Sequence, residues 1–186
     1  MAIEGILATS AVLHTTDWTQ KVSSEGKLVW NEEAKPLWIR RLDYSMIFIG
    51  IASICTSICG LIMGDSRVYR QLITPVVWLA AFFGIGSKII SVNTPRWAEG
   101  ALFLAQGWAC LLGYSDFVAG SLPGEWAWML AGGLFMSVSV FAYILQWPKY
   151  EWHTEKFAAH EVFHLGTVGG FSCFYAVMLS LVPRVV

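Results

Sequence analysis

Five stretches of this chain carry no charged side chain, and each is close to the length of a membrane-spanning helix. They run over Met46–Gly64, Gln71–Ser87, Gly100–Ser115, Trp126–Pro148 and Leu165–Pro183. With flanking apolar residues, most approach the roughly 20 residues that cross about 30 Å of hydrocarbon. Only 13% of the 186 residues are charged, against about 25% in soluble domains. The sequence therefore predicts an all-α, polytopic transmembrane helix bundle.

The N-terminal stretch Met1–Leu13 is a sixth candidate span. It is apolar apart from Glu4 but has neither the basic region nor the cleavage site of a signal peptide. A helix of this length reaches only about 20 Å, so the stretch is either a short or tilted span or the tail of a longer one. We count six spans, the first of them short, in a single transmembrane domain over residues 1–186. The longest connection, residues 15–42, is either a solvated loop or contains a short helix in the headgroup region.

The basic residues are distributed unequally between the two sides of six alternating spans. Nine of them fall in the connections 15–42, 88–97 and 148–157, and three fall on the other side, which has the predicted turn 65–70, the predicted loop 116–125 and both termini. The nine are Lys21, Lys27, Lys35, Arg40, Arg41, Lys88, Arg96, Lys149 and Lys156, and the three are Arg67, Arg70 and Arg184. Because basic loops face the cytoplasm, the three connections are predicted to be cytoplasmic. We expect an integral protein of the plasma membrane, in contact with membrane lipids, and no nucleic-acid partner, since no basic stripe is present.

Four ionisable side chains fall at one membrane depth, on the predicted cytoplasmic side. His14 ends the first span, Asp43 opens the second, and His160 and His164 open the last. Ionisable groups at this depth are costly, and a bound cation explains their coincidence. The i, i+4 spacing puts two imidazoles on one helical face, and a third histidine leaves a zinc position open for water, as in catalytic sites. Asp43 can bind that water or accept its proton. The sequence predicts a zinc site near the cytoplasmic face.

Other interpretations of the same residues remain. A lone histidine at a helix end is usually an interfacial residue, and His153, in a polar loop beside Trp152, is not taken as a ligand. The four cysteines lie inside apolar spans and are interpreted as small packing residues. They are Cys55, Cys59, Cys110 and Cys173.

Residues 160–164 also read H-E-x-x-H, the zincin signature in which the glutamate, here Glu161, is the general base. An intramembrane metalloprotease needs a further acidic ligand downstream, and no Asp or Glu follows residue 164. Glu99 and Asp43 are the only acidic residues upstream near that depth. The protease is therefore the weaker alternative.

Three motifs in order carry a family resemblance: Ser10-Ala-Val-Leu-His14, Arg40-Arg-Leu-Asp-Tyr-Ser-Met-Ile-Phe48 and His160-Glu-Val-Phe-His-Leu165. Together they resemble the hemolysin III and progestin/adipoQ receptor family, which is similar to a wider superfamily of membrane hydrolases that includes alkaline ceramidases. The resemblance implies seven helices, an outward C-terminus and a zinc ion near the cytoplasmic face. The family's first helix, with its E-x2-N-x3-H motif, has no counterpart here, so we expect the seven-helix fold without its first helix. Tyr44 stands where bacterial members tend to have histidine.

The activity predicted from these residues is zinc-assisted hydrolysis of a lipid amide, and only the resemblance supplies the ceramide-like substrate. Zinc held by His14, His160 and His164 would acidify a bound water, and Asp43 would deprotonate it. Ser10, one helical turn before His14, can hydrogen-bond the water or the developing oxyanion, or bond back to its own helix. The alternative is a membrane receptor with structural zinc. A pore-forming hemolysin fits less well, because the spans are poor in charge.

Overall fold

The computed structural model describes residues 20–22, 28–30, 36–91, 93–147 and 159–184. Within this part, five helical segments are long and apolar enough to cross a membrane. They are Leu37–Met63, Tyr69–Ile90, Arg96–Gly120, Pro123–Leu145 and Val162–Leu181. Each contains or overlaps one of the five charge-free stretches, so the predicted polytopic helical bundle is confirmed. The candidate first span, before His14, lies outside the described residues.

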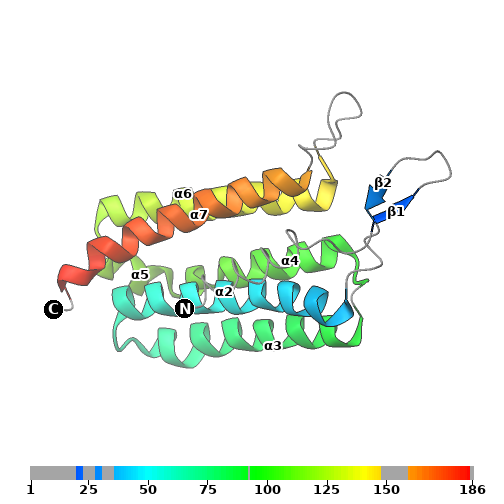
Figure 1. Cartoon of the computed structure of the whole chain (residues 1–186). Helices are drawn as coiled ribbons and strands as arrows, with labels where there is room; N and C mark the ends of the chain where they lie inside the picture. The colour runs from blue at the N-terminus through cyan, green and yellow to red at the C-terminus, as the bar shows by residue number, and fades with distance from the viewer. Residues whose placement is uncertain (1–19, 23–27, 31–35, 92, 148–158, 185–186) are drawn as a thin grey trace.

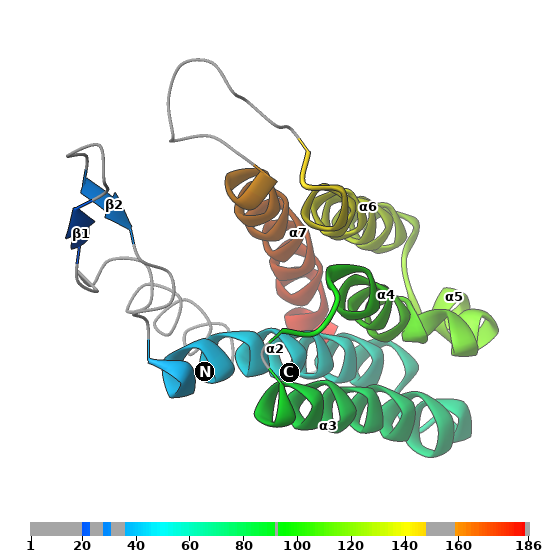
Figure 2. The ribbon, with the colours of Figure 1, turned by 90° about the vertical axis from the view of Figure 1, so that its right-hand side faces the viewer.

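The helices run roughly along one axis and form two pairs joined by a central helix. Helices α2 (Leu37–Met63) and α3 (Thr74–Ile90) form one pair, and α6 (Pro123–Leu145) and α7 (Ala159–Leu181) form the other. Helix α4 (Arg96–Gly107) lies between them and contacts α2, α3 and α6 (Figures 1 and 2). The start of α2, the end of α3, the start of α4, the end of α6 and the start of α7 all lie at one end of the bundle (Figure 1).

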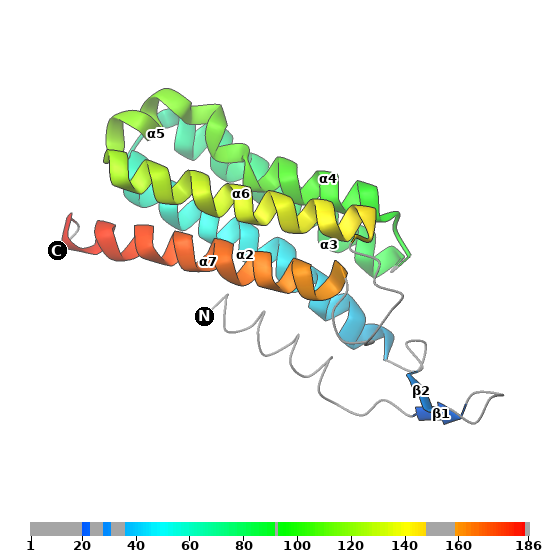
Figure 3. The same ribbon diagram turned by 90° about the horizontal axis from the view of Figure 1, so that it is seen from above.

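Two spans are not continuous α-helices. The π-helix η2 (Tyr69–Ile73) precedes α3, and α4 is followed by the 3₁₀-helix η3 (Ala109–Gly113) and the short helix α5 (Tyr114–Gly120), which Figure 3 shows turning beside α6. A last 3₁₀ turn, η4 (Val182–Arg184), follows α7. The predicted connection 116–125 is consequently too long, since only Ser121 and Leu122 separate α5 from α6. The predicted turn 65–70 is also too long, because the chain is helical again from Arg67.

Proline and glycine set the helix ends. Helices α2, α4 and α6 begin at or directly after a proline, namely Pro36, Pro95 and Pro123. Proline has no backbone N–H group, and this is tolerated at a helix start because the N–H groups of the first turn have no acceptor within the helix. Helix α2 ends at Gly64, whose φ of 54° lies in the left-handed region that favours glycine. Residues 37–42, which the sequence assigned to the long connection, are therefore the first turns of α2.

The connection before α2 contains a two-stranded hairpin that the sequence did not predict. Strand β1 (Gln20–Val22) pairs antiparallel with β2 (Leu28–Trp30), with Lys21 opposite Val29. The hairpin projects from the end of the bundle at which α2 begins (Figure 1). Both strands precede the first of the five described spans.

Apolar side chains both fill the bundle and cover its outside. Phe48, Ala52, Ile58 and Val77 are buried between helices. Large apolar side chains also face outward and are more than half exposed, among them Leu79, Phe82, Phe83, Val138, Phe141 and Leu165. Such a surface is unfavourable in water and is the one that a helix bundle presents to lipid chains. The fold thus implies contact with membrane lipids.

Small residues allow α6 and α7 to approach closely along their length. A Cβ atom on Gly166 would lie 2.5 Å from the Ser139 Cβ, and one on Gly170 would lie 2.7 Å from the Met136 Cγ. The two glycines are four residues apart and hence on one face of α7. This spacing of small residues brings helix backbones together in membranes, where lipid supplies no hydrophobic force between helices.

We expect Gly166→Ala to lower the stability of the bundle by about 1–3 kcal/mol, because the added methyl group overpacks the α6–α7 interface. The measurement is the thermal unfolding midpoint of the full chain in detergent. Gly86→Ala is the matched control, since a Cβ at Gly86 on α3 meets nothing within 4 Å. Equal midpoints for the two variants would contradict the close packing of α6 and α7.

Candidate metal centre and its polar surroundings

Asp43 lies within α2 rather than at its start. It follows Leu37, the first residue of the helix, by six positions, which is about 9 Å along the axis at 1.5 Å per residue. Its side chain is half-buried. Because α2 begins at the end of the bundle where α7 also begins, Asp43 and the first turns of α7 lie toward the same end (Figure 1). Helices α2 and α7 are in contact.

Helix α7 begins at Ala159 and therefore includes both predicted histidine ligands in its first turns. His160 and His164 are four positions apart on one continuous helix, so both positions share a face. The imidazole of His164 is half-buried and lies edge-on to Phe163, with 5.8 Å between the ring centroids. The His160 side chain lies outside the described residues.

The described side chains include only part of the predicted site. Ser10 and His14 belong to the part of the chain that is not described, so Asp43 and His164 are the two predicted site residues whose side chains can be placed. Among the described residues, no group of three or more His, Cys, Asp or Glu side chains could hold a metal ion. A zinc centre therefore depends on His14 and the His160 imidazole and stays a prediction.

A buried ion pair, which the sequence did not predict, lies at the same end of the bundle. The Lys88 ammonium on α3 pairs with the Glu99 carboxylate on α4, and their side chains are 0% and 4% exposed. The sequence assigned Lys88 to a cytoplasmic loop, but α3 continues to Ile90. The signal in the sequence was the opposite charge of two residues flanking the short connection around Pro95. Lys88 lies in the last turn of α3 and Glu99 in the first turn of α4, the helix ends whose dipoles favour each charge.

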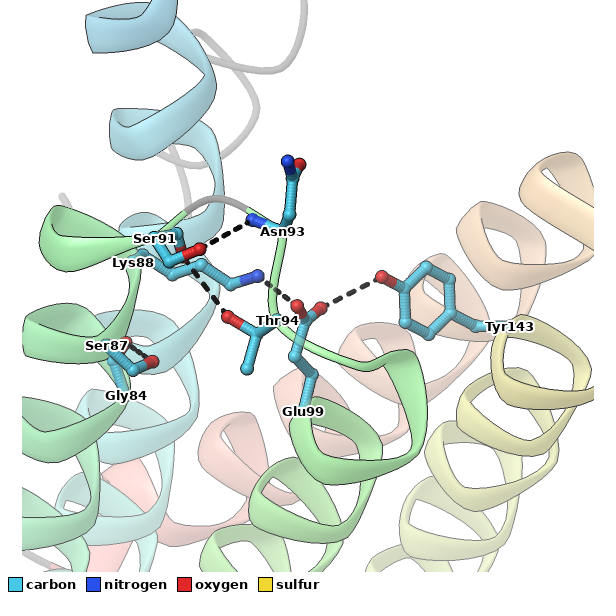
Figure 4. A network of polar contacts seen from close by, with 8 residues as sticks. All are labelled: Gly84, Ser87, Lys88, Ser91, Asn93, Thr94, Glu99 and Tyr143. Carbon is cyan, nitrogen blue, oxygen red and sulfur yellow. Dashed lines mark hydrogen bonds and ion pairs between the residues drawn. The ribbon is translucent and has the colours of Figure 1, made fainter.

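Two tyrosines extend this pair toward α6 and α2. The Tyr143 hydroxyl on α6 donates a hydrogen bond of 2.9 Å to the Glu99 Oε2 (Figure 4). The Lys88 Nζ lies 4.3 Å from the ring centroid of Tyr44, which is adjacent to Asp43 in α2. A cation over an aromatic face is a favourable contact, and more so away from water. Side chains from four helices therefore meet at one buried pair.

Other buried polar groups fix the rest of the bundle. At the opposite end, the buried Glu125 carboxylate accepts the Leu122 N–H at 2.8 Å and the Ser180 hydroxyl at 3.0 Å, which links α6 to α7. Near the middle, the buried Gln106 amide donates to the carbonyls of Phe48 at 3.0 Å and Val77 at 3.3 Å. These groups lie away from the end that carries Asp43, and their contacts are those of structural links between helices.

Removing one partner of the Lys88–Glu99 pair is expected to cost more than removing both. Lys88→Met and Glu99→Met should each lower the free energy of unfolding by about 3–5 kcal/mol, because each removes the opposite charge from a buried ionised side chain. The double variant Lys88→Met/Glu99→Met should lose clearly less than the sum. Thermal unfolding in detergent measures this, with Asp65→Asn as a control because the Asp65–Arg70 pair is exposed. Additive single effects would show that the pair is not coupled.

Comparison with known proteins gives a family but no structural relative. No solved structure matches the chain. The sequence model of the family described as "Haemolysin-III related" matches residues 2–175, nearly the whole chain and all five described spans except the end of the last. The resemblance carried by the three motifs is thereby confirmed. The chain is a multi-pass membrane protein and belongs to the haemolysin-III related family.

Proposed function

We propose that this protein is a zinc-dependent membrane hydrolase that cleaves the amide bond of a ceramide-like lipid. The observation that carries the proposal is the position of Asp43 and His164 on two contacting helices, toward one end of a lipid-exposed bundle. Carboxylate oxygens and imidazole nitrogens are the donor types that surround catalytic zinc in proteins. The ordered family motifs add His14 and His160 to the same set.

The donor set suits zinc. Imidazole nitrogens are ligands that zinc accepts readily, and two of them one turn apart on a helix can reach one ion. Three nitrogen ligands leave a coordination position open, which is typical of catalytic sites and not of closed structural ones. When bound, zinc would lower the pKa of a water molecule toward about 7 and polarise the amide carbonyl.

The remaining chemistry falls to side chains of the chain itself. Asp43 accepts the proton of the attacking water and later delivers it to the leaving amine, the role of a general acid–base group. Ser10 donates a hydrogen bond to the negative charge that develops on the amide carbonyl oxygen when water attacks the carbon. The apolar outer surfaces of the helices let a lipid reach the site from the bilayer, so that the membrane itself brings substrate and site together.

We expect Asp43→Asn to keep zinc and lose hydrolysis by about 10²–10⁴-fold, because the amide cannot accept the proton. His160→Ala should lose both zinc and hydrolysis. Zinc per chain in the detergent-purified protein and release of fatty acid from a short-chain ceramide are the two measurements. Asp65→Asn is the matched control, since Asp65 is exposed in the turn after α2.

The same experiment separates the enzyme from the receptor. A wild-type protein that holds one zinc per chain but cleaves no lipid amide, and in which His14→Ala lowers only the unfolding midpoint, would favour structural zinc. A well-folded wild-type protein without zinc would refute both.

A further inference from the structure

We infer that the Lys88–Glu99 pair and Tyr143 position the proposed metal centre, by fixing the helix pair α6–α7 relative to α2. This inference rests on the proposed function, because it assigns a role relative to the site formed by Asp43 and the histidines. The three residues are positioning residues, not ligands or acid–base groups. The evidence for this role is that side-chain contacts connect the pair both to His164 on α7 and to Tyr44, the neighbour of Asp43, on α2.

The first path leads to α7. Glu99 accepts the Tyr143 hydroxyl at 2.9 Å (Figure 4). The Tyr143 ring packs against the Phe163 ring with 5.5 Å between centroids, and Phe163 packs against the imidazole of His164 at 5.8 Å. Aromatic rings in such contact have few alternative rotamers in a packed bundle. A displacement of the Tyr143 ring would therefore be transmitted to His164.

The second path leads to α2. The Lys88 Nζ lies 4.3 Å from the Tyr44 ring centroid, and Tyr44 is adjacent to Asp43. Lys88 is fully buried, so water does not replace this contact when the ring moves. The position of the Asp43 backbone is thus tied to the same ion pair that holds Tyr143.

The arrangement of the helices makes this link necessary. Helix α7 packs extensively against α6 and only over a short stretch against α2, so direct contact alone fixes α2 and α7 weakly. Helix α4 fills the space between, and it approaches α6 closely next to the pair: a Cβ on Gly100 would lie 2.6 Å from the Ile144 Cγ1 and 3.0 Å from the Val140 Cγ1. This approach brings the Tyr143 hydroxyl within reach of Glu99.

The decisive variant is Tyr143→Phe, which removes only the hydroxyl that connects α6 to Glu99. We expect zinc affinity to fall by about tenfold, the lower end of what loss of a ligand-orienting contact costs. The visible absorption of bound Co²⁺, which reports ligand geometry, should shift. Tyr69→Phe is the matched control: its hydroxyl donates to the Thr56 carbonyl at 3.1 Å, near the opposite end of α2, and both readouts should match the wild type.

A second comparison tests the ion pair itself. Lys88→Met/Glu99→Met should weaken zinc binding by about 10- to 100-fold. The single variant Lys88→Arg, which keeps the positive charge beside Glu99, should retain most of the wild-type affinity. Glu125→Gln perturbs a buried carboxylate at the other end of the bundle and should leave the Co²⁺ spectrum unchanged. If the double variant does not fold, Tyr143→Phe decides alone.

The outcomes separate this inference from the proposed function. Zinc affinity and a Co²⁺ spectrum that are unchanged in Tyr143→Phe, with zinc bound normally by the wild type, would overturn the positioning role and leave the metal centre standing. Absence of metal binding by the folded wild type would overturn the metal centre and the positioning role together. Equal changes in zinc affinity and in the Co²⁺ spectrum for Tyr143→Phe and Tyr69→Phe would show that the contacts of Tyr143 contribute only to the stability of the bundle. That result would also overturn the inference.

Discussion

An ammonium and a carboxylate removed from water each cost several kcal/mol unless they meet in good geometry with their remaining hydrogen-bonding capacity satisfied. Lys88 and Glu99 meet this condition inside the bundle, where Tyr143 donates to the carboxylate and the Tyr44 ring faces the ammonium. The complete set of contacts forms only if the end of α3, the start of α4, the end of α6 and the start of α2 lie together. Side chains of four helices therefore meet at one electrostatic contact at this end of the bundle.

The bundle can be understood as two tightly packed helix pairs held together by polar links through α4. Close packing of small residues fixes α6 on α7. Gln106 and the Lys88–Glu99 pair link α4 to the α2–α3 pair, and the Tyr143 hydroxyl links Glu99 on α4 to α6. The proposed metal centre spans the junction between the two helix pairs, since Asp43 belongs to one pair and His164 to the other. The relative position of Asp43 and His164 therefore depends on the polar contacts between the two helix pairs more than on the packing within either pair.

The sequence predicted the five described spans and the family, but it misplaced their ends and missed the ion pair. Charge-free windows stop at the first charged residue, and Lys88, Asp116 and Glu125 were consequently assigned to loops. In the structure each belongs to a helix, because Lys88 has a buried partner, Asp116 accepts a hydrogen bond from Ser66, and the Glu125 carboxylate caps the start of α6. A hydropathy count treats every charge as solvated and cannot recognise a paired or capping one.

The sequence by itself determined the membrane class, the approximate spans and the one-turn spacing of His160 and His164, because hydrophobic length and helical period are local properties of the chain. It also carried the ordered motifs by which the family is identified. Only the tertiary structure decided which polar groups meet: that Lys88 pairs with Glu99, and that Tyr143 reaches this pair from α6. Such contacts join residues on different helices, and they follow from how closely the helices pack, which no local pattern encodes.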